Sequence, residues 1–401
     1  MVYAGINSIN VKNINRSRLL KLLNNAGAMS RKDMASALDL TPAAVTQITS
    51  ELIANGILEE RGEIEEAGRS GRKKILVDIN YRAARVLTIC IEVHEVTISV
   101  CELDGTLVEQ KKIPTDRNTD PETFILSIAD IANEIMDSVA DDGIPFIGAG
   151  VSVPGAVSRS DGISCRAQSI WRESVAVKAC LEKKLSIPII VENNVKAFAE
   201  AELVYGTGKV EDNIFFVKWG AGVGSSIVIN HTIYDNQKGI TSELGHMVVS
   251  PGGEKCWCGR SGCLETMVSV HAMTKKVLSL FSKEHTPLLY EKVHGDKNKI
   301  TEDSFESWIM TEDTAIVHIL DDAIKLLAQT VSNAVTLLAP DRVVIFGDMF
   351  NFTSVYKKFI DTYTALAPYD DKSLFMYSAL SNKIDYIGAL AVVFNDYLLI
   401  Q

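Results

Sequence analysis

One histidine and three cysteines stand in a spacing that is typical of a metal site. They are His246, Cys256, Cys258 and Cys263. Three thiolates and one imidazole suit tetrahedral Zn²⁺, and the intervening Gly259 and Gly262 let the chain fold tightly around an ion. Three ordinary buried cysteines are the alternative, but the loop is polar and rich in glycine. The sequence therefore predicts a closed, structural zinc site, since protein side chains fill all four positions.

A run of cations near the N-terminus is suited to nucleic acid. Between Gly68 and Lys74, four lysines and arginines are interspersed with glycine and serine. Arginine on a thin, flexible chain can enter a narrow minor groove. Such a run alone is usually a solvated linker, so its meaning depends on the segments beside it.

Three helices and two strands are expected around this run. The first helix is expected near Ile14–Asn24, the second opens at Ser30 as N-cap, and the third opens at Thr41 with a proline after it. Strands are expected at Ile57–Glu63 and Lys74–Ile79. Two helices joined by a tight turn, followed by a wing with a basic loop, indicate a winged helix-turn-helix domain.

The outward side of the third helix is small or polar, as the approach to base edges in a major groove requires. We expect DNA contacts from this helix and from the wing. The residues are Ala43, Ala44, Thr46, Gln47, Arg69, Arg72 and Lys73. A three-helix bundle with a basic linker is the alternative.

Composition and charge agree with a small DNA-binding head on a larger acidic body. The chain has 401 residues and a net charge of −11. Residues 1–80 hold 11 basic and 9 acidic residues, whereas the rest carries a net charge of −13. No apolar run approaches the ~18 residues of a membrane span, and the N-terminus shows no secretory signal. A cytoplasmic protein without membrane contact is expected.

After the head, predicted strands alternate with predicted helices. Strands are expected at 86–91, 96–101, 147–153, 187–191, 214–218, 226–230 and 343–346, and helices at 124–139, 195–205, 315–338 and 388–399. Glycines follow several of these strands, as in turns at strand ends. The alternation predicts an α/β fold of two similar lobes with a cleft between them.

Three motifs together resemble the ROK family of repressors, uncharacterised reading frames and sugar kinases. They are the basic motif 68–73, the segment 242–246 and the cysteine loop that ends at 262–265. The resemblance covers nearly the whole chain, and the winged helix places it beside the xylose-type and N-acetylglucosamine-type repressors. It implies a two-lobed, actin-like (ribonuclease-H-like) sugar-kinase fold after the head. The expected domains are 1–80 for the head, 81–200 for the first lobe with the C-terminal helix 386–401 packed back on it, and 201–385 for the second lobe with the zinc loop.

In this family a sugar binds in the cleft between the lobes. The resemblance implies sugar contacts from Asn193, Asn194, Glu243, His246 and Glu265. Carboxylates and amides hold the hydroxyls of a sugar ring in bidentate fashion. His246 would bind zinc through one ring nitrogen and a sugar hydroxyl through the other, so that the metal would fix its tautomer.

The sequence departs from the family's kinases where they bind ATP and move protons. The phosphate-binding turn of the kinases corresponds to 92–96, which holds no glycine here. The catalytic aspartate corresponds to Asn194, whose amide cannot take a proton, and losing a general base typically costs ~10²–10⁴-fold in rate. Ala221 stands in the second phosphate loop, where the kinases usually carry threonine. We therefore expect no enzymatic activity.

These features predict a sugar-responsive repressor of carbohydrate-utilisation genes, of the kind that controls xylose metabolism. It would bind a pseudo-palindromic double-stranded operator as a homodimer, with a tetramer as the alternative. A monosaccharide effector in the cleft would release it. Two other functions stay open: a ROK sugar kinase with a fused DNA-binding head, and a repressor controlled by a protein partner instead of a sugar.

Overall fold

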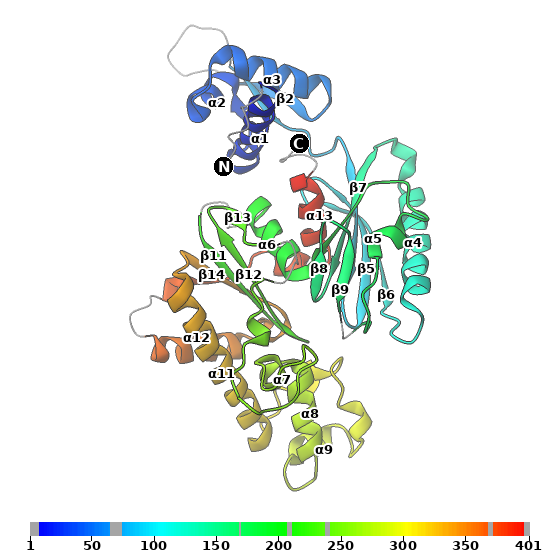
Figure 1. The fold of residues 1–401 in the computed structure, drawn as a ribbon, viewed down its shortest axis with the longest axis vertical. Helices are drawn as coiled ribbons and strands as arrows, with labels where there is room; N and C mark the ends of the chain where they lie inside the picture. The colour runs from blue at the N-terminus through cyan, green and yellow to red at the C-terminus, as the bar shows by residue number, and fades with distance from the viewer. Residues whose placement is uncertain are drawn as a thin grey trace.

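Three main sheets and one two-stranded hairpin organise the chain into an N-terminal head and two lobes (Figure 1). The computed structural model describes residues 8–64, 74–167, 170–206, 211–236, 241–367 and 372–396. Among these residues, none of the helices combines the length and the hydropathy that crossing a bilayer requires.

The head consists of three helices and a small antiparallel sheet in the order β1-β3-β2. Its elements are α1 (Ser8–Ala26), β1 (Met29–Ser30), α2 (Arg31–Leu38), α3 (Pro42–Ala54), β2 (Leu58–Ile64) and β3 (Lys74–Ile79). Both predicted N-caps are confirmed, because the side chains of Ser30 and Thr41 accept hydrogen bonds from the backbone N–H groups of Asp33 and Ala44. Asp39 adopts the left-handed conformation (φ 54°) that ends α2 and turns the chain toward α3.

The first lobe contains a five-stranded sheet in the order β10-β7-β4-β5-β6. Its strands are β4 (Arg85–Ile91), β5 (Glu95–Glu102), β6 (Leu107–Pro114), β7 (Phe146–Val153) and β10 (Ile189–Asn193). Strands β4, β7 and β10 are parallel, whereas β5 is antiparallel to both of its neighbours, β4 and β6. Every residue of β4 is buried, since α4 (Pro121–Ser138) and α13 (Ile387–Phe394) cover opposite faces of the sheet. The lobe also contains β8 (Ala156–Ser158), β9 (Ile163–Arg166) and α5 (Val177–Leu181).

The second lobe contains a five-stranded sheet in the order β13-β12-β11-β14-β15. Its strands are β11 (Ile214–Trp219), β12 (Val223–Ile229), β13 (Thr232–Ile233), β14 (Arg342–Phe346) and β15 (Phe375–Tyr377). One face packs on α6 (Asn194–Val204), and the other shares a core with α11 (Thr314–Leu338) and α12 (Thr353–Leu366). The remaining helices are α7 (Glu265–Val268), α8 (Val270–Leu280), α9 (Pro287–Lys292) and α10 (Phe305–Trp308). Short 3-10 turns include Leu244–His246 and Asp348–Asn351.

The two lobes meet where α6 packs against α13 (Figure 1). Glycines make this close packing possible. A Cβ atom added to Gly388 of α13 would lie 3.0 Å from the carbonyl carbon of Ala197 in α6, and one added to Gly150 of β7 would lie 1.9 Å from the carbonyl oxygen of Ala389. The central helix pair therefore connects both sheets with little tolerance for larger side chains.

The head rests on this same junction. Asn24, near the end of α1, donates a hydrogen bond from Nδ2 to the carbonyl oxygen of Val204, the last residue of α6 (2.7 Å). The hydroxyl of Tyr81 donates to Asn24 Oδ1 (3.2 Å), and the ring of Tyr81 stacks on Phe394 of α13. The head thus contacts the helix pair that joins the lobes.

The predicted fold class is confirmed, and the differences lie in the bounds of some elements and in elements that were not predicted. Strand β12 begins at Val223 instead of residue 226, so the turn of the glycine segment is shorter than expected. Helix α13 ends at Phe394 in the described part of the chain, and 397–401, where the prediction continued, lie outside it. Helices α8, α9 and α12 were not predicted; neither was the edge strand β6, whose side chains are mostly exposed and give no apolar pattern.

Candidate functional site

A cleft of about 590 Å³ lies between the two lobes. Both lobes contribute to its lining, including Glu92 and Arg166 from the first lobe and Trp257 from the second. The residues predicted to contact a sugar all line this cleft; they are Asn193, Asn194, Glu243, His246 and Glu265. The fold thus brings together groups that are up to 72 positions apart in the sequence.

The predicted metal ligands converge at the second lobe's side of the cleft. The ligand atoms of His246, Cys256, Cys258 and Cys263 all lie within 4.8 Å of one another. His246 Nδ1 is 3.6 Å from Cys256 Sγ, and Cys258 Sγ is 3.6 Å from Cys263 Sγ. Ligands placed roughly 2.0–2.3 Å from a central Zn²⁺ in a tetrahedron have separations of this size. The four residues could therefore hold a metal ion.

The cysteine loop closes on itself through one position that requires glycine. Gly262 has φ 74°, and a Cβ there would lie 1.7 Å from the carbonyl oxygen of Ser250. Backbone hydrogen bonds from Cys256 N to the carbonyl oxygen of Arg260 (2.8 Å) and from Gly262 N to that of Glu254 (2.8 Å) hold the turn. This fold places the cysteines beside one another.

His246 stands between the cysteine cluster and a cleft carboxylate. Its side chain is buried; Nδ1 faces Cys256, and Nε2 lies 3.7 Å from Glu243 Oε2. Burial raises the pKa of the Glu243 carboxyl, and the neighbouring His246 offsets part of this rise. The two ring nitrogens therefore point at two different kinds of partner.

Glu265 is held by two donors within the second lobe. Trp257 Nε1 donates to Glu265 Oε1 (2.8 Å), and the backbone N–H of Val223 donates to Glu265 Oε2 (3.1 Å). The sequence did not predict a function for Trp257. The signal that could have indicated one is an aromatic residue between two cysteine ligands. Its hydrogen bond fixes the orientation of a carboxylate that lines the cleft.

Asn193 acts as the N-cap of α6. Its Oδ1 accepts hydrogen bonds from the backbone N–H groups of Val195 (2.9 Å) and Lys196 (3.0 Å), and its Nδ2 donates to the carbonyl oxygen of Gly155 (2.6 Å). A side chain with three such bonds has a structural function, because it fixes the start of α6 to the turn that follows β7.

Asn194, the first residue of α6, takes part in a charged cluster with Glu92 and Lys218. Its Nδ2 donates to Glu92 Oε1 (2.7 Å), which also accepts from Lys218 Nζ (3.0 Å). Burial lowers the pKa of Lys218, but Glu92 and Asp348 more than offset this and raise it. Burial raises the pKa of Asp348. One ammonium group and two carboxylates thus occupy this end of the cleft, where a Cβ on Gly220 would lie 2.8 Å from Asp348 Oδ2.

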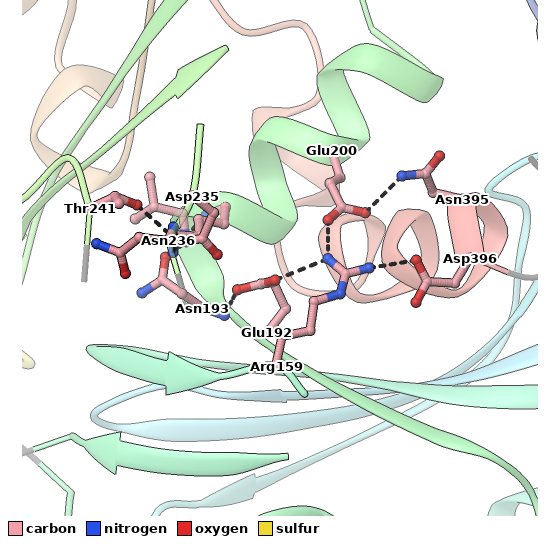
Figure 2. A network of polar contacts seen from close by, with 11 residues as sticks. Arg159, Glu192, Asn193, Glu200, Asp235, Asn236, Thr241, Asn395 and Asp396 are labelled. Atoms are coloured by element: carbon pink, nitrogen blue, oxygen red, sulfur yellow. Dashed lines mark hydrogen bonds and ion pairs between the residues drawn. The ribbon is translucent and has the colours of Figure 1, made fainter. Parts of the chain in front are cut away.

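A partly buried ionic network lies between α6 and the end of α13 and was not predicted (Figure 2). Arg159 pairs with Glu192 (3.0 Å), with Glu200 of α6, and with Asp396 (2.7 Å), which follows α13. Burial raises the pKa of Glu192 to about 7, and Glu192 Oε1 accepts from the backbone N–H of Asn193 (2.6 Å). The network connects the first lobe, α6 and the end of α13.

The described part of the predicted DNA-binding surface is a solvent-facing side of α3. Ala43, Thr46 and Gln47 are exposed and Ala44 is half-buried, whereas the opposite side of the helix packs into the head through residues such as Val45. The other predicted contacts, Arg69, Arg72 and Lys73, lie outside the described residues.

Comparisons with known proteins agree with this architecture. Residues 86–395 match the ROK family. The xylose repressor of Bacillus subtilis (strain 168) is 28% identical over 274 residues, which are 68% of this chain and 70% of the relative. The crystal structure of a ROK family transcriptional regulator, a homolog of the E. coli MLC protein, covers 97% of this chain and 98% of its own with a TM-score of 0.78 at 23% identity. A ROK family glucokinase from Streptomyces griseus, in complex with glucose and AMPPNP, covers 77% of this chain and 99% of its own with a TM-score of 0.65 at 19% identity.

Proposed function

Because the chain belongs to the ROK family, we propose that it is a transcriptional repressor of carbohydrate-utilisation genes which a monosaccharide releases from DNA. The proposal is supported chiefly by helix α6, which begins among the cleft residues and whose last carbonyl group accepts a hydrogen bond from the head. The proposed domains are residues 1–80 for the DNA-binding head, 81–200 with the C-terminal helix 386–401 for the first lobe, and 201–385 for the second lobe. The repressor works in the cytoplasm, where its operator is.

The sugar site consists of Glu243, His246 and Glu265 on the second lobe and Asn193 and Asn194 at the start of α6. All five line one cleft. Carboxylates accept hydrogen bonds from sugar hydroxyls, and amides both donate and accept. Because Asn193 already caps α6, a sugar that contacts it also contacts the helix that reaches the head.

Zinc is the ion that we assign to the cluster of three cysteines and one histidine. The donor set supports this, since thiolate and imidazole ligands at these separations suit a tetrahedral ion with no open position. When bound, the ion stabilises the loop and fixes the His246 ring. His246 Nδ1 faces the cysteines, which leaves Nε2 for a sugar hydroxyl.

In this proposal, the phosphate groups of a nucleotide do not bind at the end of the cleft that holds Lys218. Lys218 is occupied by Glu92, with Asp348 close by, so a phosphate would meet two carboxylates against one ammonium group. Asn194 donates to Glu92 and has no basic atom that could take a proton from a sugar hydroxyl. The glycine turn at 220–222 and the likeness in fold to a glucokinase favour a second candidate function, a sugar kinase.

We expect no sugar-dependent ATP turnover from the wild-type protein, and none from Asn194→Asp. The substitution restores a carboxylate, but that group would face Glu92, and the turn at 92–96 would still lack the glycines that bind phosphate in the kinases. A coupled assay for ADP release, with a panel of aldoses, measures this. Turnover at an ordinary rate of ~1 s⁻¹ or more would establish the kinase function instead.

DNA recognition is assigned to α3 in the major groove and to the wing beside it. Two heads of a homodimer read the two halves of a pseudo-palindromic operator, with a tetramer as the alternative assembly. The exposed, small or polar side of α3 supports this assignment. The residues are Ala43, Ala44, Thr46, Gln47, Arg69, Arg72 and Lys73.

Arg72→Ala is expected to weaken operator binding and to reduce the preference for A·T-rich flanks. A narrow minor groove concentrates negative potential, so an arginine inside it reads groove shape as well as charge. Binding to two operators that differ only in their flanks, each at two salt concentrations, measures the change. A uniform loss on both operators, with a salt slope lower by about one, would mean that Arg72 contacts phosphate only.

The decisive experiment joins DNA selection to sugar titration. The full-length protein selects fragments from a genomic library, and fluorescence anisotropy then measures its affinity for the selected operator with D-xylose, D-glucose or N-acetylglucosamine. We expect one sugar to weaken operator binding by roughly 5–150-fold, the usual range of allosteric coupling. Failure to select any sequence contradicts DNA regulation, whereas selection without a response to any sugar favours control by a protein partner.

A further inference from the structure

We propose that Trp257 is the positioning residue of the effector site and that it closes the cleft together with Arg166 from the opposite lobe. The inference rests on the proposed sugar binding and deepens it. Three contacts of one indole ring carry it, to Glu265, to His246 and to Arg166.

The first contact sets the orientation of the Glu265 carboxylate. Trp257 Nε1 holds one carboxylate oxygen and the backbone N–H of Val223 holds the other. With both oxygens held, the group cannot rotate freely, and each oxygen keeps a second lone pair for a sugar hydroxyl. A carboxylate fixed before binding loses less conformational freedom when the sugar arrives.

The second contact orients the His246 ring. The rings of Trp257 and His246 meet edge to face, with centroids 4.6 Å apart and an interplanar angle of 84°. Trp257 stands between Cys256 and Cys258 in the sequence, so its place in space depends on the metal loop. The ordered conformation of the metal loop therefore sets, through Trp257, the orientation of two of the proposed sugar contacts.

The third contact crosses the cleft. The guanidinium carbon of Arg166, at the end of β9 in the first lobe, lies 5.6 Å from the centroid of the Trp257 ring in the second lobe. The guanidinium of Arg166 thus lies over the indole ring, and its charge also acts on the Glu243 carboxyl of the same cleft. A planar guanidinium over an indole is a favourable cation–π pair. The pair forms only at a lobe angle that brings β9 and the loop together.

The test uses Trp257→Phe, which keeps an aromatic ring and removes the N–H donor. Trp308→Phe is the matched control, because Trp308 also donates its Nε1 hydrogen bond within the second lobe, to the carbonyl oxygen of Thr301 (3.0 Å), and does not line the cleft. Three readouts are compared in the zinc-loaded, full-length protein: zinc content, hydrogen–deuterium exchange of the Val223 amide, and calorimetric binding of D-xylose, D-glucose and N-acetylglucosamine.

We expect Trp257→Phe to keep its zinc, to exchange the Val223 amide several-fold faster, and to bind the sugar about tenfold more weakly, as the loss of a hydrogen bond to a charged group predicts. Trp308→Phe should change neither exchange nor binding. Unchanged Val223 exchange in Trp257→Phe would overturn the positioning function, and so would loss of zinc, because disorder of the loop would then explain every effect.

Arg166→Lys tests the contact across the cleft. The variant keeps the positive charge and loses the planar group that stacks, so we expect sugar binding to weaken about threefold or more. Binding equal to wild type would overturn closure by stacking. If the wild-type protein binds none of the three sugars, the proposed effector class fails, and the exchange of the Val223 amide still decides whether Trp257 positions Glu265.

Discussion

Cys258→Ser is expected to remove the metal and, with it, the response of DNA binding to sugar. The cluster would lose one of four ligands, and a hydroxyl is a poor substitute for a thiolate toward Zn²⁺. His246 and Glu265 lie at the two ends of the loop that the cluster holds, so both proposed sugar contacts lose their support. We expect the zinc content to fall from one ion per chain to nearly none. The effect of sugar on operator affinity should fall from roughly 5–150-fold to none.

Elemental analysis and operator titrations with and without sugar measure the two effects. Cys165→Ser is the matched control, because Cys165 is an exposed cysteine of β9 and not part of the cluster. It should keep both the metal and the response. A Cys258→Ser protein that lacks zinc but responds fully to sugar would contradict the link between the loop and the sugar site.

Asn24→Ala is expected to separate sugar binding from DNA release. The Asn24 side chain is buried and bonds the last carbonyl group of α6, at the opposite end from Asn193. The substitution leaves that carbonyl without its side-chain donor, at a cost of about 1–3 kcal/mol, and removes a contact by which a movement of α6 would reach the head. We therefore expect a sugar dissociation constant within about twofold of wild type, and the loss of most of the sugar effect on operator affinity.

Calorimetry and anisotropy on the same preparation measure the two quantities separately. Asn80→Ala is the control, because Asn80 also donates from its side chain, but to Gly56 inside the head (3.2 Å). Tyr81→Phe should have an intermediate effect, since it removes the hydroxyl that bonds Asn24 and keeps the ring that stacks on Phe394. A normal response in Asn24→Ala would mean that the signal reaches the head by another contact.

Local rules account for what the sequence predicted well. The caps at Ser30 and Thr41 depend on residues only three positions apart, so the sequence contains all that is needed to place α2 and α3. The metal cluster was equally accessible, because its four ligands fall within eighteen positions. Long buried strands such as β4 were found because both of their faces are apolar.

Long-range pairings account for what the sequence could not predict. Lys218 and Glu92 are 126 positions apart, and Arg159 reaches Asp396 across 237 positions. No periodicity or motif encodes such partners, because they depend on how two lobes and a returning helix pack. The same limit applies to the bond from Asn193 to Gly155, 38 positions away, and to Trp257, whose indole contacts Arg166 of the other lobe.

The place of α13 has a consequence for how the chain folds as it is synthesised. The first lobe's sheet is complete in sequence once β10 has emerged at Asn193, but one of its faces is covered by residues 387–394. At the usual 5–20 residues per second, the ribosome needs about 10–40 s to make the intervening segment. During that time the apolar side of β4 and β7 has no native cover. Its native contacts join residues that are far apart in the sequence, so they form late, and the unfinished lobe is prone to aggregation. Assembly of the lobes is therefore expected only after α13 has been made, with chaperones shielding that face until it docks.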